Sequence, residues 1–442
     1  YAWKGVPFAK PPVGALRWKA PVEPDSWSGQ LATKAFGNAC LQNGRIYGPG
    51  ANNRYDSSIA STLNTPVGSE DCLTLNIWRP AGDSANLPVI VFVYGGSNIS
   101  GYTADPVYDG AALARVANAV VVTTNYRVGV LGFMNLPQLK SGSSAAEDSG
   151  NFALLDIVQA LKFVKKNAAA FGGNADNVTL MGQSAGAINT WTLMASPLAA
   201  GLFHKAVPIS GGISLASNLP PGMLPTLNPA STYLVQGNGL LARLLIADGK
   251  ASDTVSASAY IATQTSTQIA DYLRAKPGST LLTTLLANGL TGSGPIPDGV
   301  VVPTDPIAAM AAGRYNKVPV LAGNTADEGK LFAPFLTLLG GKNGLKIADA
   351  DRFNLMANFN PDLPTALTSA DILDASYLPV TTPVTGFNAK TALLGSVFTS
   401  PSRDNVLNTL VSQQPGSVWH YQFNWAQEPA PWNEVYGAAH AF

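Results

Sequence analysis

The hydrophobic positions of the chain form short uninterrupted runs that alternate with segments of helical spacing. The clearest apolar runs lie at 87–93, 119–124, 178–181, 205–210 and 318–322. Runs of this length predict strands that are buried on both faces, as in a parallel sheet. Apolar residues at 154, 155, 158, 161 and 164 predict an amphipathic helix between Asn151 and Ala170. The pattern therefore predicts an α/β fold with a mostly parallel central sheet and helices on both faces.

Two segments break this alternation. Residues 213–295 and roughly 345–412 are rich in Ser, Thr, Ala and Leu, with apolar residues at helical spacing. We expect both segments to be helical excursions above the carboxyl edge of the sheet, where α/β folds bind ligands. No internal repeat is visible, and we interpret residues 1–442 as a single domain.

A glycine-flanked serine lies between the predicted strand at 178–181 and a predicted helix at 187–194. The residues are Gly182, Gln183, Ser184, Ala185 and Gly186. A strand, a sharp G-x-S-x-G turn and a helix form the nucleophile elbow, in which the glycines let strand and helix pass closely. The alternative interpretation is an ordinary Gly-rich turn in a βα unit, so further catalytic parts are needed to decide.

A serine hydroxyl needs a base, and the base needs an acid that holds its tautomer. In elbow hydrolases the three follow in the order Ser, acid, His. His204 comes too early, and His420 lies in the aromatic-rich run 418–425, which is typical of a core or edge strand. His440 lies among small residues in a predicted loop, where an imidazole can reach a site. We therefore select His440 as the base.

Two carboxylates compete for the role of the acid. The apolar strand at 318–322 is followed by the segment 323–329, which contains Asp327 and Glu328. An orienting carboxylate is expected just beyond the carboxyl end of a central strand, although acids also decorate ordinary helix N-termini. From the residues alone, Asp327 and Glu328 remain nearly equal candidates.

An oxyanion hole requires backbone N–H groups from the loop after an early strand and from the residue after the nucleophile. Gly95, Gly96 and Ser97 end the strand at 87–93, and Ala185 follows Ser184. This position fits the lipase and esterase pattern, although two glycines can also mark a simple turn.

The composition narrows the possible functions. Charged residues make up 12% of the 442 residues, with 27 basic and 27 acidic, so nothing indicates a nucleic-acid partner. No apolar run approaches 18 residues, so we expect no membrane span. We see no N-terminal signal segment. The three histidines are far apart and the cysteines number two, so we expect no metal site and no cofactor.

With these parts placed, the chain resembles the type-B carboxylesterases, a family of α/β-hydrolase fold that includes cholinesterases, fungal lipases and bacterial esterases. The resemblance covers nearly the whole length. It is carried by the elbow and by the motifs at 4–17, 69–76, 125–129, 150–156, 171–174, 297–299 and 327–329.

The resemblance assigns roles that the residues alone leave open. It implies that Glu328, rather than Asp327, is the acid beside His440, and that the N–H groups of Gly96, Ser97 and Ala185 hold the oxyanion. It also implies a disulfide between Cys40 and Cys72, and hence a secreted or periplasmic protein, and an ion pair between Arg17 and Glu70.

The chain departs from the family pattern in several places. Ser97 stands where Gly or Ala is usual, and Gln183 replaces the commoner Glu before the serine. The segment between Cys40 and Cys72 contains no Trp, so the cation–π platform of cholinesterases is missing. Both ends also look cut relative to the family.

The resemblance implies a serine esterase that cleaves small-molecule carboxylic esters through an acyl-enzyme on Ser184. One alternative is an interfacial lipase, but the polar segment 41–56 makes a poor lid. A second is a non-catalytic adhesion relative, which would typically have lost triad members that this chain retains. The sequence does not identify the natural ester.

Overall fold

The computed structural model describes residues 1–290, 293–360 and 365–441. Within them, eight strands form one sheet in the order β1-β4-β6-β5-β7-β8-β9-β10. Neighbours from β6 to β10 are parallel, whereas β1 and β4 run antiparallel at one edge. The predicted mostly parallel α/β-hydrolase sheet is confirmed. The strands are β1 Ala2–Pro7, β4 Thr74–Trp78, β5 Leu87–Val93, β6 Val120–Thr124, β7 Gly173–Gln183, β8 Lys205–Ile209, β9 Val320–Thr325 and β10 Val418–Phe423.

The longest strand differs most from its predicted bounds. The apolar run predicted only residues 178–181, but β7 begins at Gly173 and continues to Gln183. Its first five residues are mostly polar, so hydrophobic spacing could not reveal them. The expected turn at 182–186 therefore shrinks to a single residue between strand and helix.

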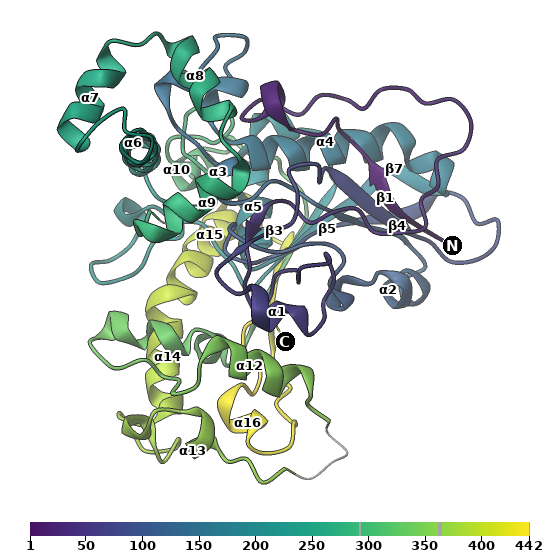
Figure 1. Cartoon of the computed structure of the whole chain (residues 1–442). Helices are drawn as coiled ribbons and strands as arrows, with labels where there is room; N and C mark the ends of the chain where they lie inside the picture. Colours follow the sequence, from purple (N-terminus) through teal and green to yellow (C-terminus); the bar gives the residue numbers. More distant parts are fainter. Residues whose placement is uncertain (291–292, 361–364, 442) are drawn as a thin grey trace.

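Helices pack against the sheet, and the hydrophobic core includes sheet residues such as Val89, Val91 and Leu180. Figure 1 shows α4 above the strands and α2 below them. The helices of this part are α2 Ala111–Val116, α3 Gly129–Gly132, α4 Phe152–Asn167, α5 Ala185–Ala195, α10 Pro306–Ala311, α11 Glu328–Leu331 and α15 Ser400–Gln413. Within the described part of the chain, no helix has the length and apolarity needed to cross a membrane.

Two helical groups project from the sheet on the side away from the N-terminus (Figure 1). The first consists of α6 Ala230–Ala247, α7 Thr254–Ala262, α8 Ser266–Arg274 and α9 Gly278–Ala287. The second contains α12 Asp349–Ala357, α13 Ser369–Ile372, α14 Phe387–Phe398 and α16 Trp432–Val435. Each group has its own apolar cluster. Residues 291–292 and 361–364 of the predicted excursions lie outside the described residues.

The first excursion begins later than predicted. Residues 213–229 carry only the short 3-10 turn η7 Ala216–Asn218 before α6 starts. Four prolines between 220 and 229 explain this difference, because proline lacks the N–H that a helix interior requires. The other 3-10 turns are η1 Gly14–Leu16, η2 Pro106–Tyr108, η3 Pro137–Leu139, η4 Glu147–Ser149, η5 Ala168–Phe171, η6 Pro197–Ala199, η8 Ala333–Leu339 and η9 Ala375–Tyr377.

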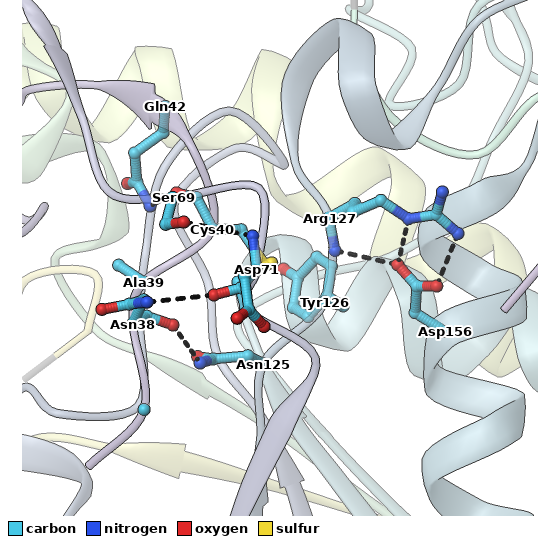
Figure 2. The surroundings of a disulfide bond; sticks show 12 residues. Asn38, Ala39, Cys40, Gln42, Ser69, Asp71, Asn125, Tyr126, Arg127 and Asp156 are labelled. Carbon is cyan, nitrogen blue, oxygen red and sulfur yellow. Dashed lines mark hydrogen bonds and ion pairs between the residues drawn. A yellow bond between two sulfur atoms is a disulfide. The ribbon is translucent and has the colours of Figure 1, made fainter. Parts of the chain in front are cut away.

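The segment between Cys40 and Cys72 is closed by a disulfide, as the resemblance implied. It holds α1 Ser58–Thr62 and a small sheet of β2 Gln42–Asn43 and β3 Pro66–Val67. Figure 2 shows the bond beside the buried ion pair of Arg127 and Asp156. The expected pair of Arg17 and Glu70 is also present, with Arg17 Nε 2.7 Å from Glu70 Oε2.

Candidate active site

Ser184 is the single residue that joins β7 to α5. Its backbone has φ 56° and ψ −121°, which is unusual for a residue with a side chain. The Ser184 N–H donates to the Ile209 carbonyl at 2.9 Å, and its own carbonyl accepts from Ile188 N–H at 3.0 Å. Its side chain remains partly exposed. This is the strained strand-to-helix geometry of a nucleophile elbow.

The glycines around Ser184 are required because the backbones nearly touch. A Cβ on Gly186 would lie 2.0 Å from the Val93 carbonyl oxygen, and one on Gly182 would lie 2.2 Å from the Gly186 oxygen. A Cβ on Gly95 would lie 2.8 Å from the Ser184 Cβ. The loop after β5, the end of β7 and the start of α5 therefore meet at the serine without space for larger residues.

Glu328 and His440 lie together beyond the end of β9. His440 Nδ1 is 2.6 Å from Glu328 Oε2, and both side chains are buried. The other carboxylate oxygen accepts from Thr325 N–H at 2.9 Å. Burial opposes ionisation of Glu328, but the adjacent His440 and the hydrogen bonds it receives hold its pKa below the ordinary value. An ionised Glu328 keeps the proton of His440 on Nδ1.

Asp327, the competing carboxylate, holds the loop that carries His440. Its Oδ2 accepts from Ala438 N–H at 3.1 Å, and its own N–H donates to the Ala438 carbonyl at 2.8 Å. The buried Lys330 Nζ lies 3.4 Å from Asp327 Oδ1. A Cβ on Gly437 would lie 2.7 Å from Asp327 Oδ2. Asp327 therefore binds the backbone of the loop, whereas Glu328 binds the imidazole.

The second nitrogen of His440 faces Gln183 and not Ser184. Gln183 Nε2 lies 3.2 Å from His440 Nε2, and no hydrogen bond joins Ser184 to His440 among the described residues. Since Nδ1 donates to Glu328, Nε2 carries the lone pair and the amide of Gln183 must be the donor. Gln183 thus holds the tautomer that a general base needs.

The loop after β5 lies against the elbow, since a Cβ on Gly95 would lie 2.8 Å from the Ser184 Cβ. Gly96 and Ser97 both have positive φ, at 108° and 56°. Within the described part of the chain, their N–H groups have no hydrogen-bond acceptor. Ala185 is the first residue of α5, so its N–H has no acceptor inside the helix. The three predicted oxyanion donors are therefore free to bind an incoming oxygen.

Three aromatic residues beside His440 were not anticipated from the sequence. The Phe332 ring packs on the imidazole with centroids 4.8 Å apart, and Phe335 and Phe398 both pack on Phe332. Phe335 is 43% exposed. The three rings form an apolar wall next to the base. The only signal in the sequence for aromatic rings near the base was that Phe332 and Phe335 follow closely after Glu328.

The two remaining histidines lie outside this arrangement. His204 Nδ1 accepts from Val178 N–H at 3.2 Å, which caps the start of the strand pairing. His420 Nε2 contacts Asn324 Oδ1 at 2.6 Å on the edge strand β10. Among the residues that the structure describes, no group of three or more His, Cys, Asp or Glu side chains is placed to hold a metal ion.

Comparison with known proteins points to one family. A profile described as the carboxylesterase family matches residues 1–442. The para-nitrobenzyl esterase of Bacillus subtilis (strain 168) is 33% identical over 440 residues, which cover 99% of this chain and 78% of that protein. The fumonisin B1 esterase of Sphingopyxis macrogoltabida is 36% identical, over 82% of this chain and 61% of that protein.

Solved structures agree with the sequence comparison. A structure of a PNB esterase superposes with a TM-score of 0.69 at 29% identity and covers 100% of this chain and 78% of its own. A Geobacillus stearothermophilus carboxylesterase gives a TM-score of 0.67 at 28% identity, over 97% of this chain and 77% of its own.

Proposed function

This chain belongs to the carboxylesterase family of carboxylic ester hydrolases, and we propose that it cleaves esters through an acyl-enzyme on Ser184. The observation that carries this mechanism is the 2.6 Å contact between His440 Nδ1 and Glu328 Oε2. That contact turns the lone pair of Nε2 toward the residues of the elbow. This geometry supports the proposal that His440 is the base for Ser184 and that Glu328 is the acid.

The first half of the reaction forms the acyl-enzyme. Ser184 Oγ attacks the ester carbonyl carbon while His440 Nε2 takes the hydroxyl proton, and Glu328 stabilises the imidazolium. The carbonyl oxygen becomes an oxyanion that accepts from the N–H groups of Gly96, Ser97 and Ala185. The intermediate then expels the alcohol oxygen, which receives the proton from His440.

Water completes the cycle by the same steps. His440 takes a proton from water, whose oxygen attacks the acyl carbon, and the oxyanion forms again at the same donors. Collapse releases the carboxylic acid, and the proton returns to Ser184 Oγ. No step requires a group other than those of the chain, the ester and water.

The substrate side of the proposal is an uncharged ester with an apolar group. The wall of Phe332, Phe335 and Phe398 supports this choice because it places uncharged aromatic rings beside His440. Gln183 supports it too, since a neutral amide lies where a carboxylate would attract a cation. The para-nitrobenzyl, fumonisin B1 and cocaine esterases are named for different esters, so the alcohol remains to be identified.

A chromogenic ester tests this proposal. Hydrolysis of p-nitrophenyl butyrate should show a burst of p-nitrophenol equal to the enzyme concentration when deacylation is slow. Ser184→Ala should abolish both the burst and the turnover. A protein that binds the ester without releasing p-nitrophenol would instead fit a non-catalytic relative.

The segment between Cys40 and Cys72 helps to distinguish an esterase from an interfacial lipase. Its apolar residues Ile46 and Ile59 are buried and pack on Phe353 of α12, so they do not offer an apolar lid to a lipid surface. We expect the rate on tributyrin to rise smoothly through the solubility limit. A sharp rise on forming an emulsion would indicate a lipase.

We also propose that the protein works in an oxidising compartment, secreted or periplasmic. The disulfide of Cys40 and Cys72 supports this location, because such bonds rarely persist in the cytosol. Peptide mapping of protein purified from its own source, without reductant, should recover the linked pair. Two free thiols would contradict the proposed location.

A further inference from the structure

The loop that offers the proposed oxyanion donors has an unusual backbone. Gly96, Ser97 and Asn98 have positive φ in succession, at 108°, 56° and 58°. Side chains rarely adopt this conformation because Cβ approaches the backbone carbonyl oxygen. Such a conformation persists only where surrounding contacts enforce it. The contacts of Asn98 therefore matter for the position of the donors.

Asn98 is joined to the nucleophile helix by a reciprocal amide pair. Asn189 Nδ2 donates to Asn98 Oδ1 at 2.9 Å, and Asn98 Nδ2 faces Asn189 Oδ1 at 3.3 Å. The two residues are 2% and 0% exposed. Asn189 lies in α5, whose first residue is Ala185. The pair thus connects the segment of Gly96 and Ser97 to the helix that supplies the third donor.

Other bonds anchor the same loop, but to different parts of the chain. The Asn98 carbonyl accepts from Gly129 N–H at 2.7 Å and from Ser293 Oγ at 2.6 Å. At the end of the loop, Gly101 exchanges hydrogen bonds of 2.8 and 2.9 Å with the Gln42 side chain. Among the described residues, only the amide pair joins the loop to α5 by hydrogen bonds.

We propose that Asn98 and Asn189 are positioning residues that set the spacing between the two halves of the oxyanion hole. The inference rests on the proposed function, because it concerns the transition state of ester hydrolysis. The loop and α5 are far apart in sequence, because Asn189 follows Asn98 by 91 positions. Without the pair, Gly96 and Ser97 can drift relative to Ala185, and the three N–H groups no longer converge on one oxygen.

The chemistry of the amide explains why both positions are asparagine. Each side chain donates one N–H to the other and offers one oxygen in return, so the two buried amides satisfy part of each other's hydrogen-bonding capacity. Alanine at either position leaves the other amide buried without its partner. Aspartate would place two acceptors, and a charge, against each other.

The experiment measures kcat, KM and the inhibition constant of a trifluoromethyl ketone. Addition of Ser184 Oγ to its carbonyl carbon gives a hemiketal whose oxyanion mimics the tetrahedral intermediate. Asn189→Ala removes one amide while keeping a strong helix former in α5. Asn98→Gly removes the other amide and tolerates the positive φ. With p-nitrophenyl butyrate, kcat should fall about 10- to 100-fold, with KM changed less than about threefold.

The affinity for the inhibitor should fall in parallel with kcat, because the oxyanion of the bound inhibitor depends on the same N–H donors as the oxyanion of the reaction. The double variant should be hardly worse than either single variant, since each one already breaks the pair. If Asn98→Gly does not fold, Asn189→Asp serves as the second variant. It keeps the size of the side chain but loses the amide, so its kcat and inhibitor affinity should resemble those of Asn189→Ala.

Asn76→Ala is the matched control. Asn76 is fully buried, accepts from Gly5 N–H at 2.9 Å and donates to Thr123 Oγ1 at 3.1 Å, away from the elbow. It should lower the melting temperature and leave kcat unchanged at 25 °C.

Two results would overturn the inference. If the Asn98 and Asn189 variants behave like Asn76→Ala, with lower melting temperature but unchanged kcat and inhibitor affinity, the pair is only structural. If the parent enzyme releases no p-nitrophenol, the proposed function itself fails, and the inference fails with it.

Discussion

Ser184 and His440 come to the same site from two regions that are held in different ways. The nucleophile side comprises β5, β7, α5 and the loop at 94–101, and there the backbones touch so closely that Gly182 and Gly186 leave no room for a Cβ. The acid–base side comprises β9, α11 and the loop at 437–440, and there polar groups hold the chain. Close backbone packing dominates around Ser184, whereas hydrogen bonds hold Glu328, His440 and the loop that carries His440.

This difference predicts how each side fails. A larger residue on the nucleophile side must move the backbone, so stability and activity fall together. A change of a polar group on the acid–base side leaves the core intact, so activity falls while most of the stability remains. The predictions below test this contrast, beginning with the largest expected effect.

The two sides should act as one unit in catalysis. Ser184→Ala and His440→Ala should each lower kcat by about 10⁴-fold or more, and the double variant should lose little beyond that. Steady-state kinetics on p-nitrophenyl butyrate measure all three. Losses that multiply in the double variant would show that Ser184 and His440 act independently.

The neighbouring carboxylates should separate orientation of the base from support of its loop. Glu328→Gln should lower kcat by roughly 10³- to 10⁴-fold, because the imidazole loses its anionic partner. Asp327→Asn keeps one acceptor for Ala438 N–H and should cost no more than about tenfold. Each variant is the control for the other, because both replace a carboxylate by an amide of similar size at adjacent positions. The reverse order of effects would assign the acid to Asp327.

Acid pH should weaken the acid–base side through Glu328. Its pKa is lowered on folding, so it adds stability above the unfolded value of about 4.3, and this contribution is lost as pH falls through the folded pKa. The difference in unfolding free energy between the parent and Glu328→Gln should be constant near neutral pH and shrink in acid. A difference that grows in acid would contradict the assigned direction.

Steric changes on the nucleophile side should cost stability. Gly186→Ala would place Cβ 2.0 Å from the Val93 oxygen and should destabilise by about 1–3 kcal/mol or more, with loss of activity. Gly395→Ala in α14 is the matched control, since the nearest atom to its Cβ would be the Gly329 nitrogen at 3.7 Å. Alanine favours a helix there and should be neutral or stabilising by up to about 1 kcal/mol. Urea denaturation compares the two, and equal stabilities would remove the steric argument.

The smallest expected effect concerns Gln183, which ends β7 on the nucleophile side and contacts His440 on the acid–base side. Position 183 carries no carboxylate, and the Cys40–Cys72 segment contains no tryptophan, so neither offers a partner for a quaternary ammonium. A desolvated cation–π contact is worth about 2 kcal/mol or more, so its absence should remove any choline preference. The ratio of kcat/KM for butyrylcholine to that for an uncharged butyrate ester should stay below about ten. A larger ratio would reveal a cation site elsewhere.

The nucleophile side could be predicted from the sequence because its signals are local. The apolar run at 87–93 became β5 without change, and Gly182, Ser184 and Gly186 fall within five consecutive residues. Steric requirements between neighbouring residues leave a direct pattern in the chain. The family resemblance, which the comparisons confirm, extended this reading to the whole length.

The acid–base side was harder to predict because its contacts join residues distant in sequence. The spacing of the residues left Asp327 and Glu328 tied, and only the resemblance separated them. The contact of Gln183 with His440 spans 257 positions. On the nucleophile side, the pair of Asn98 and Asn189 spans 91 positions and was missed for the same reason. Hydrophobic periodicity shows which face of an element is buried, but not which polar side chains meet across the fold.

The central claim is that Ser184 alone becomes acylated, and a fluorophosphonate probe tests it most directly. The probe should add one phosphonyl group to the intact protein, and peptide mapping should place that group on Ser184. Labelling should disappear in Ser184→Ala and slow strongly in His440→Ala, because the base activates the hydroxyl. A phosphonyl group on any other residue of the active parent enzyme would contradict the account.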